Sequence, residues 1–558
     1  MQRSKTNRVY DVVANFIRSH PFLTLCLVGA YLSFVGISHE LWTPDEPRDA
    51  AVGRAMWRMG DWVIPRLNGE PFLEKPPLYW WSQSAIFALF GQATPSLARL
   101  PSALFGFASL LLTYLLGRRF FSARSCLLAG LILLTMSLFM VTTHWIVVDN
   151  ALLFSVIGAW TFFACAQMRE GPARQWLLFG MYLFFALAFL TKGIVGLGIP
   201  VLGMTTYLLW SKQLKKFIGW HLLLGVALVV GAATLWLWLL RMEGGRQSLE
   251  TFLIYNQFGR FFPGAVVYRG GHERPFWYYF VNTPADLLPW TPFVLLAAIL
   301  AWRYWERLSD SEREGIRLCT SATLPVFFAL SLAGTKRGLY LLPIFPLIAL
   351  LVGWWGTTDW PSPRWQDKLE RWWEWVVIAI VALSPAAIVL TPRLWFYWLP
   401  GVVVLVLFFY AFKIPLPKER PARLLGTAFL LCLALGNMFI TVPPFIDGFK
   451  SFVPFVKELE RQAGSTATLY AYRPDETTLG IVNFYTGRSL RVIGLEELKA
   501  MARGSTREQV VVRDSRPKGG NYGEITRAGI PHRLVSEQLV GDRRTMRIIT
   551  VGGSNEIR

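Results

Sequence analysis

Acidic and basic side chains are concentrated in one polar stretch between two hydrophobic segments near the N-terminus. Residues 41–81 read LWTPDEPRDAAVGRAMWRMGDWVIPRLNGEPFLEKPPLYWW. They contain the adjacent carboxylates Asp45 and Glu46, several arginines, and a Glu-Lys-Pro-Pro run in which Lys75 is the lysine. Carboxylates, guanidinium groups and a lysine crowded into a short loop beside a bilayer are what a phosphate-handling site requires. The alternative is a capped surface helix with ordinary exposed charges.

The first half of this stretch has a helical pattern. Pro44 and Pro47 stand where prolines start a helix, and the apolar residues that follow at helical spacing are Ala51, Val52, Ala55, Met56 and Met59. This pattern predicts an amphipathic helix lying on a membrane surface, with Arg54 and Arg58 on its other side. Asp45 and Glu46 precede it, near a helix N-terminus, where negative charge is favoured.

The composition is that of a membrane protein. Of 558 residues, 53% are hydrophobic and only 16% are charged, against roughly 25% charged residues in soluble domains. The net charge of +20 is dispersed and accompanied by no nucleic-acid motif, so it favours anionic lipid over nucleic acid, and we expect no nucleic-acid partner. The five cysteines all fall in predicted spans and imply no disulfide or thiolate-metal site; they are Cys26, Cys126, Cys165, Cys319 and Cys432.

Apolar runs long enough to span a bilayer recur from residue 22 to about residue 442, which predicts a polytopic α-helical membrane protein. We expect about thirteen spans, near 22–38, 97–117, 126–142, 149–167, 175–191, 194–210, 220–240, 287–304, 317–332, 339–356, 373–391, 395–412 and 424–442. The first lacks a clear cleavage site and is expected to be retained. Basic residues gather in alternate loops, which are therefore cytoplasmic. The loops 41–96 and 241–286 and the C-terminal tail then face outward.

The composition changes after residue 442, and we predict a small α/β domain over 443–558 outside the membrane domain 1–442. Apolar or alternating runs at 467–472, 490–493, 509–513, 533–539 and 545–551 predict strands. Helical patterns at 476–485 and 495–503 lie between the early ones. The domain has no cysteine and no glycine-rich phosphate fingerprint, which favours a scaffold or docking lid.

Other candidate residues also lie on the outer side. Asp149 stands at the outer mouth of a span, where a carboxylate is costly unless it has a partner or a function. Lys192 and the Lys336-Arg337 pair oppose the positive-inside trend and need an anionic partner, either a lipid phosphate or a neighbouring carboxylate. In the 241–286 loop, arginines such as Arg260 alternate with aromatic residues, which suits a polar head group or an interfacial aromatic belt.

Several motifs occur in order and on the same side of the membrane. They are Asp45-Glu46, Glu74-Lys75-Pro76-Pro77-Leu78-Tyr79-Trp80, Phe189-Leu190-Thr191-Lys192-Gly193, His272 with Pro275-Phe276-Trp277-Tyr278-Tyr279, and Lys336-Arg337-Gly338-Leu339-Tyr340-Leu341-Leu342-Pro343. With them the chain resembles the bacterial aminoarabinose transferases of lipid A, membrane glycosyltransferases of the C-type fold related to the protein O-mannosyltransferases. The resemblance covers most of residues 1–442, and the C-terminal domain fits it by topology only.

The resemblance implies a lipid-dependent pentosyltransferase that inverts the transferred sugar. It implies transfer of 4-amino-4-deoxy-L-arabinose from undecaprenyl phosphate to a lipid A phosphate, on the periplasmic face of the bacterial inner membrane. Such an activity confers resistance to polymyxin and other cationic peptides. We expect a monomer that needs no cofactor.

The same resemblance assigns roles to residues. Asp45 and Asp149 match acidic catalytic positions, Lys75 matches the lysine expected on the carrier phosphate, and Arg260 and Tyr340 look like lining residues of the donor site. The further residues expected to bind substrate are Glu46, Arg48, Lys192, Lys336 and Arg337. Glu74 and His272 are the candidate ligands of a structural divalent metal.

The chemistry fits amphiphilic substrates at a membrane boundary. The leaving group is a carrier phosphate, so it needs positive charge more than a proton. A lipid A phosphate is already ionised and nucleophilic, so Asp45 would bind the donor's ammonium group or stabilise an oxocarbenium-like sugar. The outer loops contain no Asp-x-Asp motif for a metal-bound nucleotide sugar.

Two other classes of protein remain open. A protein O-mannosyltransferase-like enzyme would use the same lipid-phosphate donor with a hydroxyl acceptor, and would need Asp45 as a true base. A transporter of a lipid-linked sugar would show polar residues at mid-bilayer and internal repeats, and the spans show neither clearly.

Overall fold

A computed structural model describes residues 15–42, 45–259, 272–358, 364–383, 419–464, 467–514, 520–541 and 544–553. The chain forms two compact units. The first comprises Met1–Gly36, Glu74–Tyr79 and Pro101–Thr441, and the second comprises Ile37–Leu73, Trp80–Leu100 and Val442–Arg558. The second unit thus contains the predicted C-terminal domain together with most of the predicted 41–96 loop.

Long apolar helices confirm the polytopic architecture. Within the described ranges, seven helices are long and apolar enough to cross a membrane, or nine if each of two bent pairs is one span. The seven are α5 (Pro95–Gly117), α8 (Asp149–Gln167), α9 (Gly171–Trp210), α11 with the π-helix η1 (Trp220–Phe258), α15 (Asp310–Leu332), η3 with α16 (Gly338–Thr357), and α20 (Arg420–Lys450). The predicted spans 373–391 and 395–412 lie partly or wholly outside the described residues.

Several predicted spans differ in detail. The span predicted at 126–142 is two helices, α6 (Ala123–Thr135) and α7 (Ser137–Thr143), bent by 70°. The region at 287–304 is α14 (Thr291–Arg303), preceded across a 107° bend by α13 (Tyr278–Asp286). The first span is the shorter helix α2 (Pro21–Phe34), and α17 (Arg364–Leu383) precedes α20.

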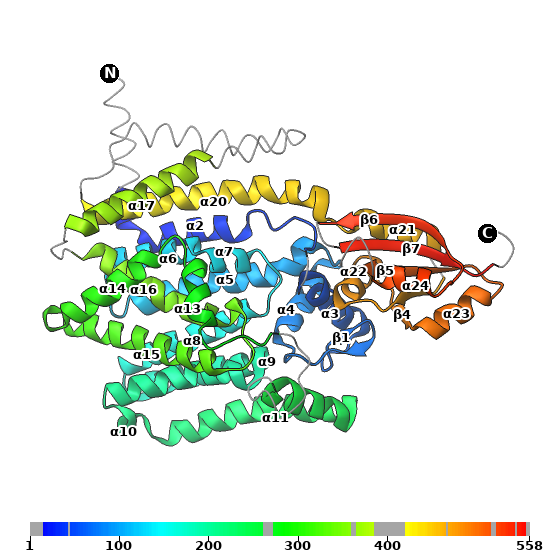
Figure 1. Ribbon diagram of the computed structural model, residues 1–558. Helices are drawn as coiled ribbons and strands as arrows, with labels where there is room; N and C mark the ends of the chain where they lie inside the picture. Colours follow the sequence, from blue (N-terminus) through cyan, green and yellow to red (C-terminus); the bar gives the residue numbers. More distant parts are fainter. Residues whose placement is uncertain are drawn as a thin grey trace. The chain divides into compact units, whose positions relative to one another are not determined.

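Close helix packing holds the first unit together. Helices α8 and α9 lie against each other, as do α6 and α16 (Figure 1). A Cβ at Gly158 of α8 would lie 2.1 Å from the ring of Phe184 on α9, and one at Gly180 of α9 would lie 2.4 Å from the ring of Phe162 on α8. Small residues that receive a large neighbour are the usual solution for helices in a bilayer, where association depends on close packing.

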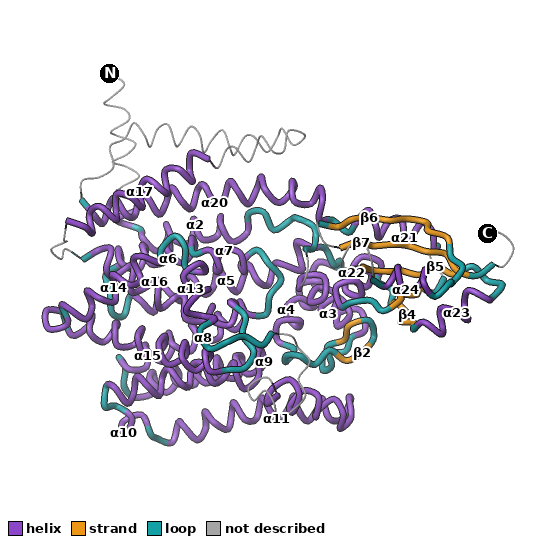
Figure 2. The backbone as a smooth tube through the Cα atoms, viewed as in Figure 1, coloured by secondary structure: helices purple, strands orange, loops and turns teal. Residues whose placement is uncertain are grey.

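The C-terminal part of the second unit has a five-stranded sheet, which confirms the predicted α/β domain (Figure 2). The strand order is β4-β3-β5-β7-β6, with β3 parallel to β4 and β5, and β7 antiparallel to β5 and β6. The strands are β3 (Leu469–Tyr472), β4 (Leu490–Ile493), β5 (Glu508–Asp514), β6 (Arg533–Val540) and β7 (Arg544–Val551). The helices are α21 (Val453–Ala463), α22 (Glu476–Thr486), α23 (Leu495–Arg503) and α24 (Asn521–Arg527). Both helices predicted between the early strands are present.

The first loop forms helix α3 (Asp45–Met59), a short hairpin of β1 (Arg66–Leu67) and β2 (Glu70–Pro71), and helix α4 (Leu78–Phe90). The predicted helix is present as α3. The prediction that its apolar face lies on a membrane surface is wrong. Val52 and Met56 of α3 are buried and the helix packs against α22, whereas Met59 is 58% exposed. The apolar face of α3 therefore belongs to a protein core.

Candidate active site

The centre of the candidate site in the first unit is a break in helix α9. Lys192 (φ −141°, ψ 18°) and Gly193 (φ 64°, ψ −140°) leave helical geometry inside this 40-residue helix. A continuous helix of that length would be about 60 Å long, roughly twice the hydrocarbon thickness. The break therefore separates the two segments that the sequence predicts as 175–191 and 194–210.

Local chemistry accounts for the break. Gly193 has the positive φ that glycine adopts at little cost. The side-chain Oε1 of Gln257, on η1 (Thr251–Phe258), accepts a hydrogen bond of 3.0 Å from the Ile194 N–H, and so supplies an acceptor for the first amide after the break. A Cβ at Gly193 would lie 2.1 Å from that oxygen. A π-helix often marks a functional site.

The break directs Lys192 toward two predicted site residues. Its Nζ donates a hydrogen bond to Oδ1 of Asp149, the first residue of α8. The same Nζ lies 4.0 Å from the centroid of the Tyr340 ring, a cation–π distance. Both charged side chains are buried, with 10% of Lys192 and 5% of Asp149 exposed. A neighbouring carboxylate is therefore the anionic partner that the sequence requires for Lys192.

A pocket within the first unit unites residues from distant parts of the sequence. Its lining residues are Glu74, Lys75, Lys192, Val195, Asn256, Gln257, Leu330, Ala333, Thr335 and Tyr340. Lys75 and Arg337 are close enough for their charges to act on that of Lys192. Three predicted substrate-binding residues, Lys75, Lys192 and Tyr340, thus line one cavity. Asn256 and Gln257 also line this cavity, although neither was among the predicted site residues. The sequence feature that could have indicated them is a polar pair that follows an apolar run.

Lys336, predicted to bind substrate, makes hydrogen bonds to backbone carbonyls in the structure. Its Nζ donates hydrogen bonds to the backbone carbonyls of Arg274, at 2.8 Å, and of Ala333. Its backbone N–H donates to the carbonyl of His272, and Glu273 and Thr335 form a β-bridge beside it. Burial lowers the pKa of the Lys336 amine. We therefore assign Lys336 to joining two segments of the chain.

The remaining candidates in this unit have less defined roles. The backbone carbonyl of Arg337 accepts a hydrogen bond of 3.2 Å from the Tyr279 hydroxyl. Glu74 lines the pocket and His272 is exposed. Within the described ranges no group of three His, Cys, Asp or Glu side chains could hold a metal ion. Arg260 lies outside the described residues.

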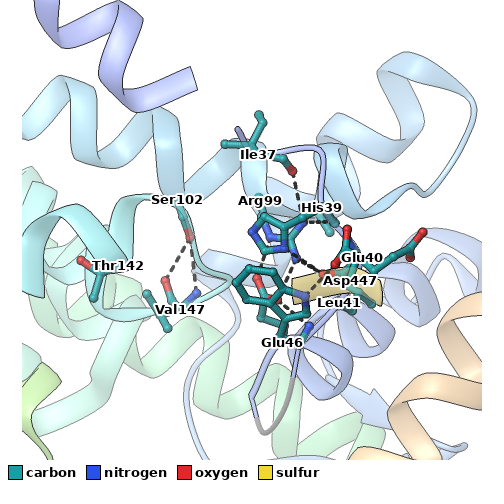
Figure 3. Close-up of polar contacts among 12 residues, drawn as sticks. Ile37, His39, Glu40, Leu41, Glu46, Arg99, Ser102, Thr142, Val147 and Asp447 are labelled. Carbon is teal, nitrogen blue, oxygen red and sulfur yellow. Dashed lines mark hydrogen bonds and ion pairs between the residues drawn. The ribbon is translucent and has the colours of Figure 1, made fainter. Parts of the chain in front are cut away.

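In the second unit, Glu46 forms a buried ion pair with Arg99 (Figure 3). Its two oxygens accept hydrogen bonds of 2.7 Å from Nε and Nη2 of Arg99, and Oε2 also accepts one of 2.8 Å from the Trp42 N–H. Both side chains are fully buried. Because one buried guanidinium donates to both oxygens of its carboxylate, we assign Glu46 to this ion pair, and its role in substrate binding stays a prediction.

Arg99 extends this cluster along the chain. Its Nη1 and Nη2 also donate to the backbone carbonyls of Ile37, His39 and Glu40. Asp447 accepts from the Glu40 N–H, at 3.1 Å, and from the Trp42 indole N–H, at 2.8 Å. Sequence analysis did not select Arg99. A lone arginine at the start of an apolar span was the available signal, because such a charge requires a partner.

Asp45 and Arg48 form the second charged cluster of this unit. Nη2 of Arg48 donates to Oδ1 of Asp45 at 3.2 Å and lies 3.6 Å from Oδ2 of Asp49. Asp45 is 7% exposed. Oδ1 of Asp49 in turn accepts from the Trp80 indole N–H at 3.2 Å. A carboxylate beside a guanidinium at the first turn of a helix can take part in electrostatic or acid–base chemistry.

Together the fold and the site define a polytopic membrane protein with the fold of a lipid-phosphate glycosyltransferase. The crystal structure of ArnT from Cupriavidus metallidurans bound to undecaprenyl phosphate has this fold, with a TM-score of 0.76 at 20% identity over 96% of this chain and 98% of that one. The apo structure of the same protein gives a TM-score of 0.72.

Sequence comparison confirms the resemblance that the motifs indicate. Residues 74–238 match the family described as dolichyl-phosphate-mannose-protein mannosyltransferase. The undecaprenyl phosphate-alpha-4-amino-4-deoxy-L-arabinose arabinosyl transferase of Pseudomonas aeruginosa is 30% identical over 59% of this chain. The enzyme of that name from Erwinia tasmaniensis is 30% identical over 56% of it. The matched regions span 58% and 55% of these relatives' own lengths.

Proposed function

We propose that this protein is a membrane pentosyltransferase that moves 4-amino-4-deoxy-L-arabinose from undecaprenyl phosphate to a lipid A phosphate. Two named arabinosyl transferases are similar to it over more than half of the chain, and its fold is that of ArnT. The modified lipid A is less anionic, and cells that carry it resist polymyxin and other cationic peptides.

The observation that carries this proposal is the pocket lined by Lys75, Lys192 and Tyr340. Lys192 is already paired with Asp149, so Lys75 is the lysine whose charge serves a substrate. An ammonium group in a partly apolar cavity interacts strongly with a phosphate because little water screens the charges. The aromatic ring of Tyr340 adds a face against which a sugar ring packs.

The transfer is an inverting displacement at the anomeric carbon of the sugar. A phosphate oxygen of lipid A forms a bond to that carbon, and the bond from the carbon to the oxygen of undecaprenyl phosphate breaks. The carrier phosphate leaves with the bonding electron pair, and Lys75, supported by the charge of Arg337, stabilises the negative charge that develops on it. Asp149 holds Lys192 in position as a lining residue of the pocket.

Asp45 acts on the sugar in this proposal. Its carboxylate either binds the ammonium group of the donor or stabilises positive charge on the oxocarbenium-like sugar. The acceptor phosphate is ionised before the reaction, so no general base is needed. Transfer needs no metal, because the leaving group is a single phosphate that a lysine can neutralise. The basic residues gathered in alternate loops support a site on the periplasmic side of a bacterial inner membrane.

Mass spectrometry of lipid A tests the proposal. Lipid A from cells that express this protein and contain the aminoarabinose donor should be heavier by one aminopentose than lipid A from cells without it. Cells with Lys75→Ala should give the unmodified mass. Unmodified lipid A in every strain, with the wild-type protein present in the membrane, would contradict the proposed function.

A second candidate is transfer to a hydroxyl group, because residues 74–238 match a mannosyltransferase family. A lipid A phosphate monoester has its second ionisation near about pH 6, and its mono-anion is already a nucleophile. With a phosphate acceptor, turnover of the purified enzyme should therefore persist below that pH, whereas transfer to a hydroxyl group should follow the ionisation of the base. Lipid A stripped of its phosphates should accept no sugar. Equal transfer to dephosphorylated lipid A, or to a protein serine, would favour the hydroxyl acceptor.

A further inference from the structure

Helix α22 of the α/β domain packs directly on helix α3, which carries Asp45 (Figure 1). The two helices approach closely at Gly480 of α22. A Cβ at this position would lie 2.7 Å from the backbone N of Arg48 and 2.7 Å from the backbone carbonyl of Pro47. Real Cβ atoms essentially never approach other atoms so closely, so only glycine allows α22 to lie this near to the first turn of α3.

Side chains secure both ends of α22. Near its N-terminus, Oε2 of Glu476 accepts a hydrogen bond of 3.0 Å from Nη1 of Arg48. In its last turn, the carbonyls of Asn483 and Phe484 accept hydrogen bonds from Nη1 of Arg54, with 3.1 Å for the first. A guanidinium at a helix C-terminus satisfies carbonyls that have no intrahelical partner and complements the helix dipole.

The β1–β2 turn adds a third attachment. Asn68, in the left-handed conformation (φ 57°), accepts a hydrogen bond of 2.7 Å from the Leu490 N–H and donates one of 2.8 Å to the Leu490 carbonyl. Its side chain pairs with β4 as a strand residue would. Asn483 of α22 donates to the same Asn68 oxygen at 3.1 Å. The β1–β2 turn is therefore hydrogen-bonded to both α22 and β4.

Arg48 connects this interface to Asp45. One of its terminal nitrogens pairs with Glu476 and the other with Asp45, and only 11% of its side chain is exposed. A guanidinium presents its donors in a rigid planar fork, so a displacement at one terminal nitrogen rotates the other. The placement of α22 thus sets the orientation of the group that holds the Asp45 carboxylate.

We propose that the C-terminal α/β domain positions Asp45 for transfer, with Gly480 and Glu476 as positioning residues that act through Arg48. This inference rests on the proposed role of Asp45 in sugar transfer. The Glu476 side chain is 54% exposed, and an ion pair with such an exposed partner contributes little. The backbone approach at Gly480 therefore contributes more than the charge of Glu476.

The experiment compares two glycine-to-alanine variants of the full-length protein in lipid nanodiscs. Gly480→Ala should lower kcat about tenfold or more, because a misplacement of about 1 Å near reacting atoms can cost that much. The KM for the undecaprenyl-phosphate donor should change little where Asp45 stabilises the oxocarbenium-like sugar, and should rise where Asp45 binds the ammonium group of the donor. Gly523→Ala is the matched control, because Gly523 lies in α24 of the same domain and a Cβ there meets nothing within 4 Å. It should keep wild-type kcat.

Hydrogen exchange gives a readout that does not depend on catalysis. In Gly480→Ala, the backbone amides of α3 should exchange faster, while the amides of β5 and β7 keep wild-type protection and so report a folded domain. Wild-type kcat together with wild-type exchange in α3 would overturn the inference, as would an equal rise in exchange throughout the α/β domain. If Asp45→Asn keeps full activity, the proposed role of Asp45 fails, and the exchange result still reports on the interface.

A charge-changing variant covers the case in which Gly480→Ala does not fold. Glu476→Lys should lower kcat severalfold, because the lysine repels Arg48. Glu496→Lys is its control, since Glu496 is an exposed glutamate on α23 whose partner is Lys499. Equal kcat values for these two variants and the wild type would also count against the inference.

Discussion

The ammonium group of Lys192, a residue in the non-helical break of α9, donates a hydrogen bond to the carboxylate of Asp149 on α8. The two residues are far apart in the sequence and lie in different helices. In the low-dielectric interior of a membrane protein neither charge is tolerated alone, and each satisfies the other. The pair also holds Lys192 against Tyr340 at the edge of the pocket.

Removal of one member of this pair should destabilise the protein and stop transfer. Asp149→Asn or Lys192→Met alone leaves one buried charge without a partner, a change that costs about 3–5 kcal/mol in buried pairs. The double variant removes both charges and should recover most of the thermal stability without recovering activity. Thermal unfolding in nanodiscs and a transfer assay measure the two effects. Additive losses of stability in the double variant would show that the two residues do not interact.

Lys75 should be required for activity and dispensable for folding. It lines the pocket from a loop, so Lys75→Ala removes charge and no core contact, and transfer should be lost while membrane insertion and melting temperature stay unchanged. Lys75→Arg should rescue poorly because the guanidinium fork differs from an ammonium in shape and reach. Lys499→Ala, at a surface lysine of α23, is the control. Wild-type transfer by Lys75→Ala would remove this residue from the mechanism.

Substitutions of the adjacent carboxylates Asp45 and Glu46 should have different effects, one on activity and the other on stability. Asp45→Asn should keep a folded protein and lose roughly two orders of magnitude or more in kcat, the scale of one positioned electrostatic or acid–base group. Glu46→Gln should unfold at lower temperature, because it leaves the fully buried Arg99 guanidinium without its charged partner. Kinetics and thermal unfolding of both variants separate the roles. Unchanged stability with lost activity in Glu46→Gln would return it to the substrate site.

The break in α9 should depend on Gly193. Gly193→Ala places a Cβ 2.1 Å from Oε1 of Gln257 at a positive φ, so the break must shift and move Lys192 away from Asp149. We expect transfer to fall about tenfold or more. Gly198→Ala, in the same helix where a Cβ meets nothing within 4 Å, should keep activity and be slightly more stable, since alanine favours a helix over glycine. Equal activity of the two variants would show that the break does not position Lys192.

Sequence periodicity by itself determined the local structure of this protein. Long apolar runs predicted the helices, and short alternating runs predicted all five strands of the C-terminal sheet close to their observed bounds. Side-chain burial repeats with the period of the element itself, so these features can be read within a window of a few residues. Lys75, Lys192 and Tyr340 were also predicted, from charges against the positive-inside trend and from motif resemblance, and the tertiary structure brings them into one pocket.

Only the tertiary structure decided which charges are available for chemistry. Asp45 and Glu46 are neighbours in sequence, but successive residues of a helix point about 100° apart, so one faces Arg48 and the other faces Arg99. Lys336 donates hydrogen bonds to backbone carbonyls, and Lys192 donates one to the carboxylate of Asp149. Each of these partners comes from a segment whose distance in space depends on how the helices pack. The identity of a charged residue can be read locally, whereas its partner is determined by long-range contacts.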